Sequence, residues 1–268
     1  MKMKAQILSH LPATHPWRDS VLWFNTIDST NTQAKTLAAA GAPHGTVLIA
    51  DSQSAGRGRL GRVFQSPPNS GIYMSVILRP HCPPAALMHL TCAAAVAICD
   101  AVENALGFRP GVKWINDLVY ERKKLAGILT ELSIDPKTGL VDYAIVGIGI
   151  NCSQSKEDFP PELHEIACSA AMILGNTVDR SRLAGAMMEA LERMSHNLFA
   201  EQENIMARYR QDCITIGSEV TVIRGDERHQ GKALDVKEDG SLLVLFADGH
   251  TAAVNSGEVS VRGLYSYT

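Results

Sequence analysis

The pattern of apolar residues in this sequence changes near Gly217. Before it, helical apolar spacing is mixed with short strand-like runs. After it come only short apolar runs, separated by Gly-Asp and Asp-Gly turns, at residues 220–223, 231–236, 242–246 and 251–254. Residues 215–268 are therefore expected to form a small β-barrel domain, and residues 1–214 a separate body.

The body itself mixes helix and strand patterns. Helices are expected over residues 31–38, 85–106, 161–174 and 180–210. Strand-like runs lie at residues 46–50, 72–78, 112–115, 118–120, 125–132 and 141–150. Ser29 or Thr30 can cap the first helix, and Gly41 stands where that helix should end. The predicted fold class is α+β: a mixed sheet with flanking helices, followed by the barrel.

Composition narrows the function. The chain has 268 residues, of which 46% are hydrophobic and 20% charged, as in ordinary globular proteins. The net charge is −3 and no segment is strongly basic, so DNA is not an expected partner. The most apolar stretch, residues 85–99, is too short and too interrupted to span a bilayer, and the N-terminus has no secretory pattern. We expect no membrane association and a cytoplasmic protein.

The six cysteines form no C-x-x-C pair and do not stand beside a histidine at the spacing of metal ligands. The nine histidines are equally dispersed. Reduced, buried thiols and no transition-metal site are therefore expected.

Residues 56–62, with the sequence Gly-Arg-Gly-Arg-Leu-Gly-Arg, form the first unusual segment. Its glycines disfavour a helix and present backbone N–H groups, while Arg57, Arg59 and Arg62 supply guanidinium groups that suit a carboxylate or phosphate. It is not a P-loop, because no Gly-Lys-Ser/Thr follows. Taken alone, the pattern fits a flexible surface turn or an RNA-contacting segment equally well.

Two more segments suggest a site. Lys113 lies in an apolar strand directly before the turn Asn116-Asp117, so it needs an anion or must extend to solvent. When this pattern is taken alone, the better explanation is an outward-facing lysine on an edge strand. Gly147 and Gly149 let a ligand approach a strand closely, although a bend with Asn151 capping a turn would give the same pattern.

Together with Asp28-Ser29-Thr30-Asn31 and residues 124–131, these segments resemble biotin–protein ligases in content, order and spacing. The resemblance covers residues 20–262, and residues 256–262 look like the closing strand of the family's small SH3-like barrel. It implies a catalytic body related to class II aminoacyl-tRNA synthetases. Only some twenty residues precede Val21, so we expect the ligase-only type that lacks an N-terminal DNA-binding domain.

The resemblance implies the activity of a biotin–[acetyl-CoA-carboxylase] ligase. ATP with Mg²⁺ would activate biotin to biotinyl-5′-AMP, and biotin would then pass to a lysine of a biotin carboxyl carrier protein. The implied partner is the carrier domain of acetyl-CoA carboxylase or a related carboxylase, and the implied assembly is a monomer or homodimer.

The resemblance also assigns residues. For biotin they are Ser29, Thr30, Asn31, Gln53, Arg57, Gly58, Arg59, Lys113 and Gly127, the last letting the ligand ring lie flat on the sheet. For the nucleotide they are Arg57, Arg59, Arg62, Lys113, Asn116, Asp117 and Asn151. Lys113 and Arg59 are the implied catalytic residues, and Asp117 is the candidate Mg²⁺ ligand.

The sequence departs from the family at Leu60, Phe64 and Ile115, where members often carry a basic residue, a tryptophan and a proline. These changes bear on how the loop orders and how well it retains the adenylate. We expect residues 56–62 to be mobile without ligand, and a β-branched residue at Gly58 to weaken that retention. The alternatives are a lipoate or octanoate ligase or transferase of the same fold, and a non-catalytic binder of biotinyl-AMP or RNA.

Overall fold

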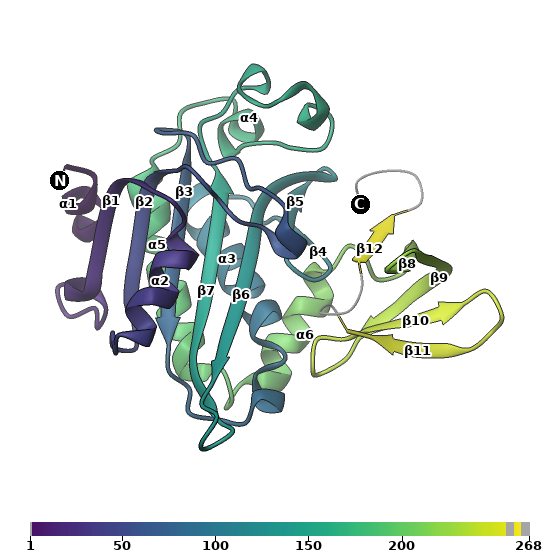
Figure 1. Ribbon diagram of the computed structural model, residues 1–268. Helices are drawn as coiled ribbons and strands as arrows, with labels where there is room; N and C mark the ends of the chain where they lie inside the picture. The colour runs from purple at the N-terminus through teal and green to yellow at the C-terminus, as the bar shows by residue number, and fades with distance from the viewer. Residues whose placement is uncertain (1, 256–259, 264–268) are drawn as a thin grey trace.

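The computed structural model describes residues 2–255 and 260–263. A seven-stranded sheet forms the centre of the body, in the order β1-β2-β3-β7-β6-β5-β4 (Figure 1). Its strands are β1 (Val21–Ile27), β2 (Thr46–Gln53), β3 (Gly71–Leu78), β4 (Gly111–Lys113), β5 (Asp117–Tyr120), β6 (Lys123–Ile134) and β7 (Val141–Asn151). β1 and β2 run parallel and the other neighbours are antiparallel, so the predicted mixed sheet is confirmed.

The helices of the body are α1 (Lys2–Ser9), α2 (Thr30–Ala39), α3 (Leu90–Leu106), α4 (Ala170–Leu174), α5 (Arg180–Asn197) and α6 (Gln202–Asp212). In Figure 1, α3, α5 and α6 lie behind the sheet and α2 lies in front of it. Alternation along β2 explains this arrangement. Val47 and Ile49 join the large core behind the sheet, while Leu48 packs with Ala34 and Ala38 of α2. α2 leaves the front face of β5 and β6 uncovered.

The helix predictions were partly right. Ser29 caps α2, accepting a hydrogen bond from the Thr32 N–H, and Gly41 follows that helix with a positive φ. The predicted helix over residues 161–174 is wrong except for the short α4. The backbone there pairs with β6 instead, because Lys124 donates to the Ile166 carbonyl and accepts from the Cys168 N–H. The helical pattern over residues 180–210 is two helices, and α1 was not predicted.

The segment Pro84–Leu106 is long and apolar enough to cross a membrane, but 72% of its most apolar window is buried in the protein. It begins with the short 3-10 helix Pro84–Leu87 and continues as α3, which ends at Gly107 in the left-handed region. Its side chains pack against the sheet and α5, so the prediction of a core helix is confirmed.

The C-terminal unit is an antiparallel sheet in the order β11-β10-β9-β8-β12. Its strands are β8 (Glu219–Arg224), β9 (Glu227–Val236), β10 (Leu242–Phe246), β11 (Thr251–Val254) and β12 (Ser260–Gly263). Gly225, Gly240 and Gly249 have positive φ in its turns, which explains the repeated glycines. Of the predicted closing strand, residues 256–259 lie outside the described residues, while Ser260–Gly263 pairs with β8.

A turn of this unit packs behind the segment that follows β4. The Trp114 indole N–H donates to the Gly240 carbonyl at 2.9 Å, and the Trp114 backbone N–H donates to Thr215 Oγ1 at 2.9 Å. The Tyr209 hydroxyl of α6 donates to the Ile115 carbonyl at 3.2 Å. The residues between Lys113 and Asp117 are therefore supported from behind by both units.

Candidate active site

A cavity of about 580 Å³ opens on the front face of the sheet, between α2, the loop of residues 54–64 and strands β4 to β7. Its lining contains every residue assigned to biotin or the nucleotide except Asn151. These are Ser29, Thr30, Asn31, Gln53, Arg57, Gly58, Arg59, Arg62, Lys113, Asn116, Asp117 and Gly127. Segments that are distant in sequence thus meet around one space.

The floor of the cavity is made of glycines on neighbouring strands. Gly127 of β6 and Gly149 of β7 are register partners, and the Phe64 ring lies over them. A Cβ on Gly149 would stand 2.5 Å from that ring, and one on Gly147 would stand 1.8 Å from Asn31 Oδ1. The glycines therefore give the floor the flatness expected from Gly127, although Phe64 itself lies on this part of it.

One end of the cavity is an uncharged polar network. Gln53 Oε1 accepts from the Thr30 N–H at 2.8 Å and from Thr30 Oγ1 at 3.1 Å. Ser75, which is fully buried on β3, donates to Thr30 Oγ1 and is 2.7 Å from Asn31 Oδ1. The sequence analysis missed Ser75, although a lone serine in an apolar strand is a signal that could have identified it.

The other end of the cavity is strongly cationic. Arg59, Arg62, Lys113 and Lys124 line it, and Asp117 is its carboxylate. Arg57 also lines the cavity but lies nearer the polar network, because it pairs with Glu131, which bonds to Asn31. Arg59 Nη1 donates to Asn116 Oδ1 at 3.1 Å, and Lys124 Nζ forms an ion pair with Asp117 at 2.7 Å. Such an excess of cations around a partly enclosed space suits a ligand with several negative charges.

Two properties of this end bear on its chemistry. Burial lowers the pKa of Arg59, against the opposing attraction of Asp117, so its guanidinium is partly dehydrated and interacts strongly with an anion. The Asn116 side chain donates to the Ile128 carbonyl at 3.0 Å, which fixes its amide and aims its oxygen at Arg59. Lys124 was not singled out from the sequence.

The glycine–arginine loop crosses in front of β7 and β6 (Figure 1). The Gly58 N–H donates to the Arg62 carbonyl at 2.7 Å and the Phe64 N–H donates to the Gly56 carbonyl at 2.9 Å, so the segment folds as a small hairpin. Gly58 has an extended backbone, which any residue adopts. The tight position is Gly56, where a Cβ would stand 2.3 Å from the Phe64 carbonyl oxygen.

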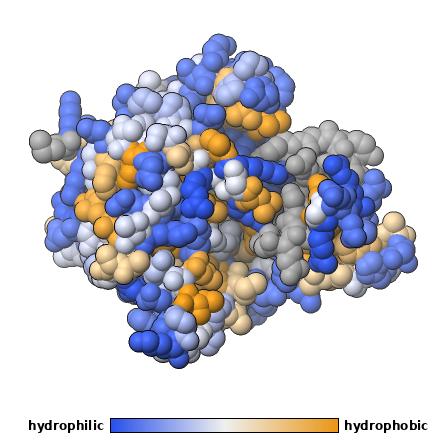
Figure 2. Space-filling view, viewed as in Figure 1, coloured by the Kyte–Doolittle hydropathy of each residue, from blue (hydrophilic) through white to orange (hydrophobic). Residues whose placement is uncertain are grey.

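This loop is exposed both at its tip, Leu60, and at its base, Val63. The face seen in Figure 2 is mostly hydrophilic, with hydrophobic residues in small separate groups. Among the described residues, Val63 and Leu60 are the most exposed large hydrophobic side chains, at 74% and 66%. The loop thus covers the cavity without burying its own tip.

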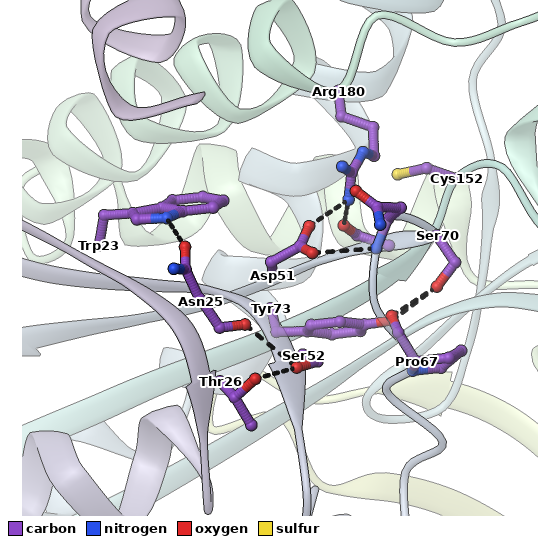
Figure 3. Close-up of polar contacts among 12 residues, drawn as sticks. Trp23, Asn25, Thr26, Asp51, Ser52, Pro67, Ser70, Tyr73, Cys152 and Arg180 are labelled. Carbon is purple, nitrogen blue, oxygen red and sulfur yellow. Dashed lines mark hydrogen bonds and ion pairs between the residues drawn. The ribbon is translucent and has the colours of Figure 1, made fainter. Parts of the chain in front are cut away.

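The return of this loop to β3 is tied down by a polar cluster (Figure 3). Arg180 of α5 pairs with Asp51 at 3.1 Å and donates to the Gly71 carbonyl at 3.0 Å. The Tyr73 hydroxyl donates to the Pro67 carbonyl at 3.0 Å, and burial raises the pKa of Tyr73 to about 12, so it keeps its proton. Because the Tyr73 ring packs edge-on against Phe64, the cluster also supports the cavity floor.

Asn151 is the assigned residue that the structure does not bring to the cavity. It is buried at the end of β7, where its amide nitrogen donates to the Cys168 carbonyl at 3.1 Å and its oxygen faces Gln154. These bonds occupy the side chain and fix the chain after β7. In this structure Asn151 supports the wall and does not line it.

Metal ligands are sparse. Within residues 2–255 and 260–263, no group of three or more His, Cys, Asp or Glu side chains could hold a metal ion. Mg²⁺ that is bound with a nucleotide needs fewer protein ligands, because phosphate oxygens and water supply most of its ligands. Asp117, a carboxylate beside the cationic end, fits that limited role. All six cysteines are free thiols, and all but Cys82 are buried.

The lining of the cavity suits a ligand that carries an uncharged polar group beside an anion. Residues 23–151 match the Biotin/lipoate A/B protein ligase family, and residues 215–262 match the Biotin protein ligase C terminal domain. The chain belongs to the biotin protein ligase family.

Individual relatives support the same family assignment. The chain is 35% identical over 234 residues to the bifunctional ligase/repressor BirA of Bacillus subtilis, covering 85% of this chain and 70% of that protein. It is 34% identical over 238 residues to the biotin–[acetyl-CoA-carboxylase] ligase of Mycobacterium tuberculosis, covering 86% and 85%. The biotin protein ligase of Aquifex aeolicus, solved with biotin and ATP, superposes with a TM-score of 0.76 at 29% identity, covering 91% and 98%. These relatives favour a biotin ligase over the lipoate alternative.

Proposed function

We propose that this one cavity carries out both half-reactions of a biotin protein ligase. In the first, an oxygen of the biotin carboxylate attacks the α-phosphorus of ATP, forming biotinyl-5′-AMP as pyrophosphate leaves. In the second, a lysine amine of a carrier protein attacks the carbonyl carbon of the mixed anhydride, forming an amide as AMP leaves. The observation that carries the proposal is the arrangement of an uncharged polar network beside five cationic side chains in one space.

The polar network would bind the ureido ring of biotin. That ring presents one carbonyl acceptor and two N–H donors, so it needs a pocket with both donors and acceptors. Ser29, Thr30 and Gln53 supply hydroxyl and amide groups, and the buried Ser75 keeps Thr30 and Asn31 in place. Because these groups already bond to one another, little side-chain entropy is lost when the ring binds.

The cationic end would bind the carboxylate and the phosphates. Lys113 and Arg59 would hold the two reacting anions together and stabilise the negative charge that develops at the α-phosphate. Arg57, Arg62, Asn116 and Asp117 would contact the nucleotide. Mg²⁺, when bound with ATP, would be held by Asp117 and would neutralise part of the phosphate charge.

The acceptor is a biotin carboxyl carrier protein, in line with the family, and we propose the carrier domain of acetyl-CoA carboxylase or a related carboxylase. We also propose that the chain works in the cytoplasm without binding DNA. Specific retention of a DNA duplex in a gel shift at physiological salt would contradict the last point.

The test is release of pyrophosphate from ATP with biotin, lipoate or octanoate as the acid, each with and without a carrier domain. We expect release with biotin alone, limited to about one equivalent while the adenylate stays bound, and continuous turnover with biotin and carrier together. Release with lipoate or octanoate but not with biotin would overturn the proposal.

A further inference from the structure

Glu131 of β6 contacts three groups from two other segments of the chain. Its carboxylate accepts a hydrogen bond from Asn31 Nδ2 at 3.0 Å and pairs with Lys35 Nζ at 3.1 Å, both on α2. It also pairs with Arg57 Nη1 of the glycine–arginine loop at 3.3 Å. Its side chain is 19% exposed and does not line the cavity. Glu131 is not among the residues assigned to biotin, the nucleotide or Mg²⁺.

The contact with Asn31 joins Glu131 to the polar end of the cavity. Asn31 directs its amide N–H groups to Glu131 and to the Leu129 carbonyl, and its oxygen lies 2.7 Å from Ser75 Oγ. The absence of a side chain at Gly147 leaves the space in which this amide sits. A continuous chain of hydrogen bonds therefore runs from the biotin pocket to Glu131.

The contact with Arg57 joins the same carboxylate to the loop. Arg57 stands at the base of the loop hairpin, where its backbone bridges Val63, and its side chain is half exposed. Burial opposes ionisation of Glu131, but the hydrogen bonds from Asn31 and Lys35 and the charge of Arg57 lower the pKa of Glu131 overall. It is therefore an anion at neutral pH, and it attracts Arg57 toward the sheet.

We propose that Glu131 is a positioning residue that links the biotin pocket to closure of the glycine–arginine loop. By holding Arg57 against β6, it keeps the loop over the cavity, and by holding Asn31 it ties that closure to the geometry of the pocket. This rests on the proposed function, because the ligand that the closed loop retains is biotinyl-5′-AMP.

The variant Glu131→Gln tests the proposal, because an amide can still accept from Asn31 but has no charge to attract Arg57. We expect biotinyl-5′-AMP to leave the full-length protein about tenfold faster, as for loss of a charge-assisted hydrogen bond. Amide exchange across residues 56–62 should rise in the complex. The matched control is Lys35→Gln, which removes a partner of the same carboxylate on α2 and should change release by less than about twofold.

A double variant separates positioning from a general structural role. If Glu131 acts through Arg57, adding Glu131→Gln to Arg57→Gln should speed release no further than Arg57→Gln alone. Three outcomes would each overturn the proposal. The effects of the two changes could be additive, or release could be unchanged in Glu131→Gln. Release could also be slower, because Glu131 had held Arg57 away from the ligand. Amide exchange across residues 56–62, measured with and without biotin, reports the Glu131–Arg57 contact even when no adenylate forms. Failure of the proposed function can therefore be distinguished from failure of this proposal.

Discussion

The cavity has two walls that are held in very different ways. The wall at residues 113–117 is buried on its far side, with Trp114 and Ile115 only 5% and 4% exposed, and both protein units donate hydrogen bonds to it or accept them. The opposite wall is the loop of residues 54–64, whose tip is exposed and whose contacts are few side-chain bonds. A preorganised wall suits stabilisation of charge, and a movable wall suits entry and retention of ligands.

The first prediction concerns Lys113→Ala on the fixed wall. We expect adenylate formation to fall by about two orders of magnitude or more, because a preorganised cation typically contributes about 3 kcal/mol at a transition state. The measurement is the single-turnover rate of biotinyl-AMP formation. Lys123→Ala is a suitable control, since Lys123 is a neighbouring lysine on β6 that does not line the cavity. A parent-like rate in Lys113→Ala would place the catalytic cation elsewhere.

The second prediction concerns the floor between the walls. In Gly149→Ala the new methyl would stand 2.5 Å from the Phe64 ring, so that ring must leave its place over the floor. We expect biotin and ATP binding, measured by calorimetry, to weaken by roughly tenfold, in the range of an overpacked core. A second change, Phe64→Leu, should restore part of the loss by making room. No rescue would mean that the methyl blocks the ligand directly.

The sequence predicted residues that line the cavity walls, but not the residues that hold those walls in place. Thr30, Lys113 and Gly127 were predicted because their residue types suit hydrogen bonding, charge or close approach at motif positions, and all line the cavity. Glu131 and Ser75 were missed because their partners are set by strand register and by α2, which spacing along the chain does not reveal.

The same limit explains two differences between the sequence patterns and the structure. Asn151 belongs to a matching motif, but its neighbours in the fold occupy its amide. Residues 161–174 have helical spacing, yet Lys124 at the start of β6 offers backbone N–H and C=O groups that a helix there would leave unpaired. In both cases tertiary contacts override a valid local pattern.

The third prediction concerns two glycines of the loop. The requirement for glycine first assigned to Gly58 is not evident from its extended backbone, whereas Gly56 packs its α-carbon against the Phe64 carbonyl and Ser66. Gly56→Ala should therefore speed release of biotinyl-AMP several-fold. Gly58→Ala should change it less, because a Cβ there would have only Arg62 atoms nearby, the nearest being the carbonyl oxygen at 3.3 Å. Stopped-flow release measures both. Equal effects would show that flexibility, not packing, makes the loop need glycine.

The smallest effect is expected where the fixed wall meets the barrel. Trp114→Phe keeps an aromatic ring in place but leaves the buried Gly240 carbonyl without its indole donor. Loss of one buried hydrogen bond costs about 1 kcal/mol, so the midpoint of thermal unfolding should fall by a few degrees. The matched control is Trp23→Phe, because Trp23 donates to Asn25 in an exposed bond whose loss costs less.

Adenylate formation in Trp114→Phe should stay within about threefold of the parent, since the Thr215 and Tyr209 bonds still hold the segment and each is of similar strength. Redundant support is what makes a wall rigid: several modest contacts fix one backbone path, and none of them alone decides its position. A loss of activity as large as that of Lys113→Ala, with an unchanged midpoint, would mean that the barrel places Lys113 through this single bond.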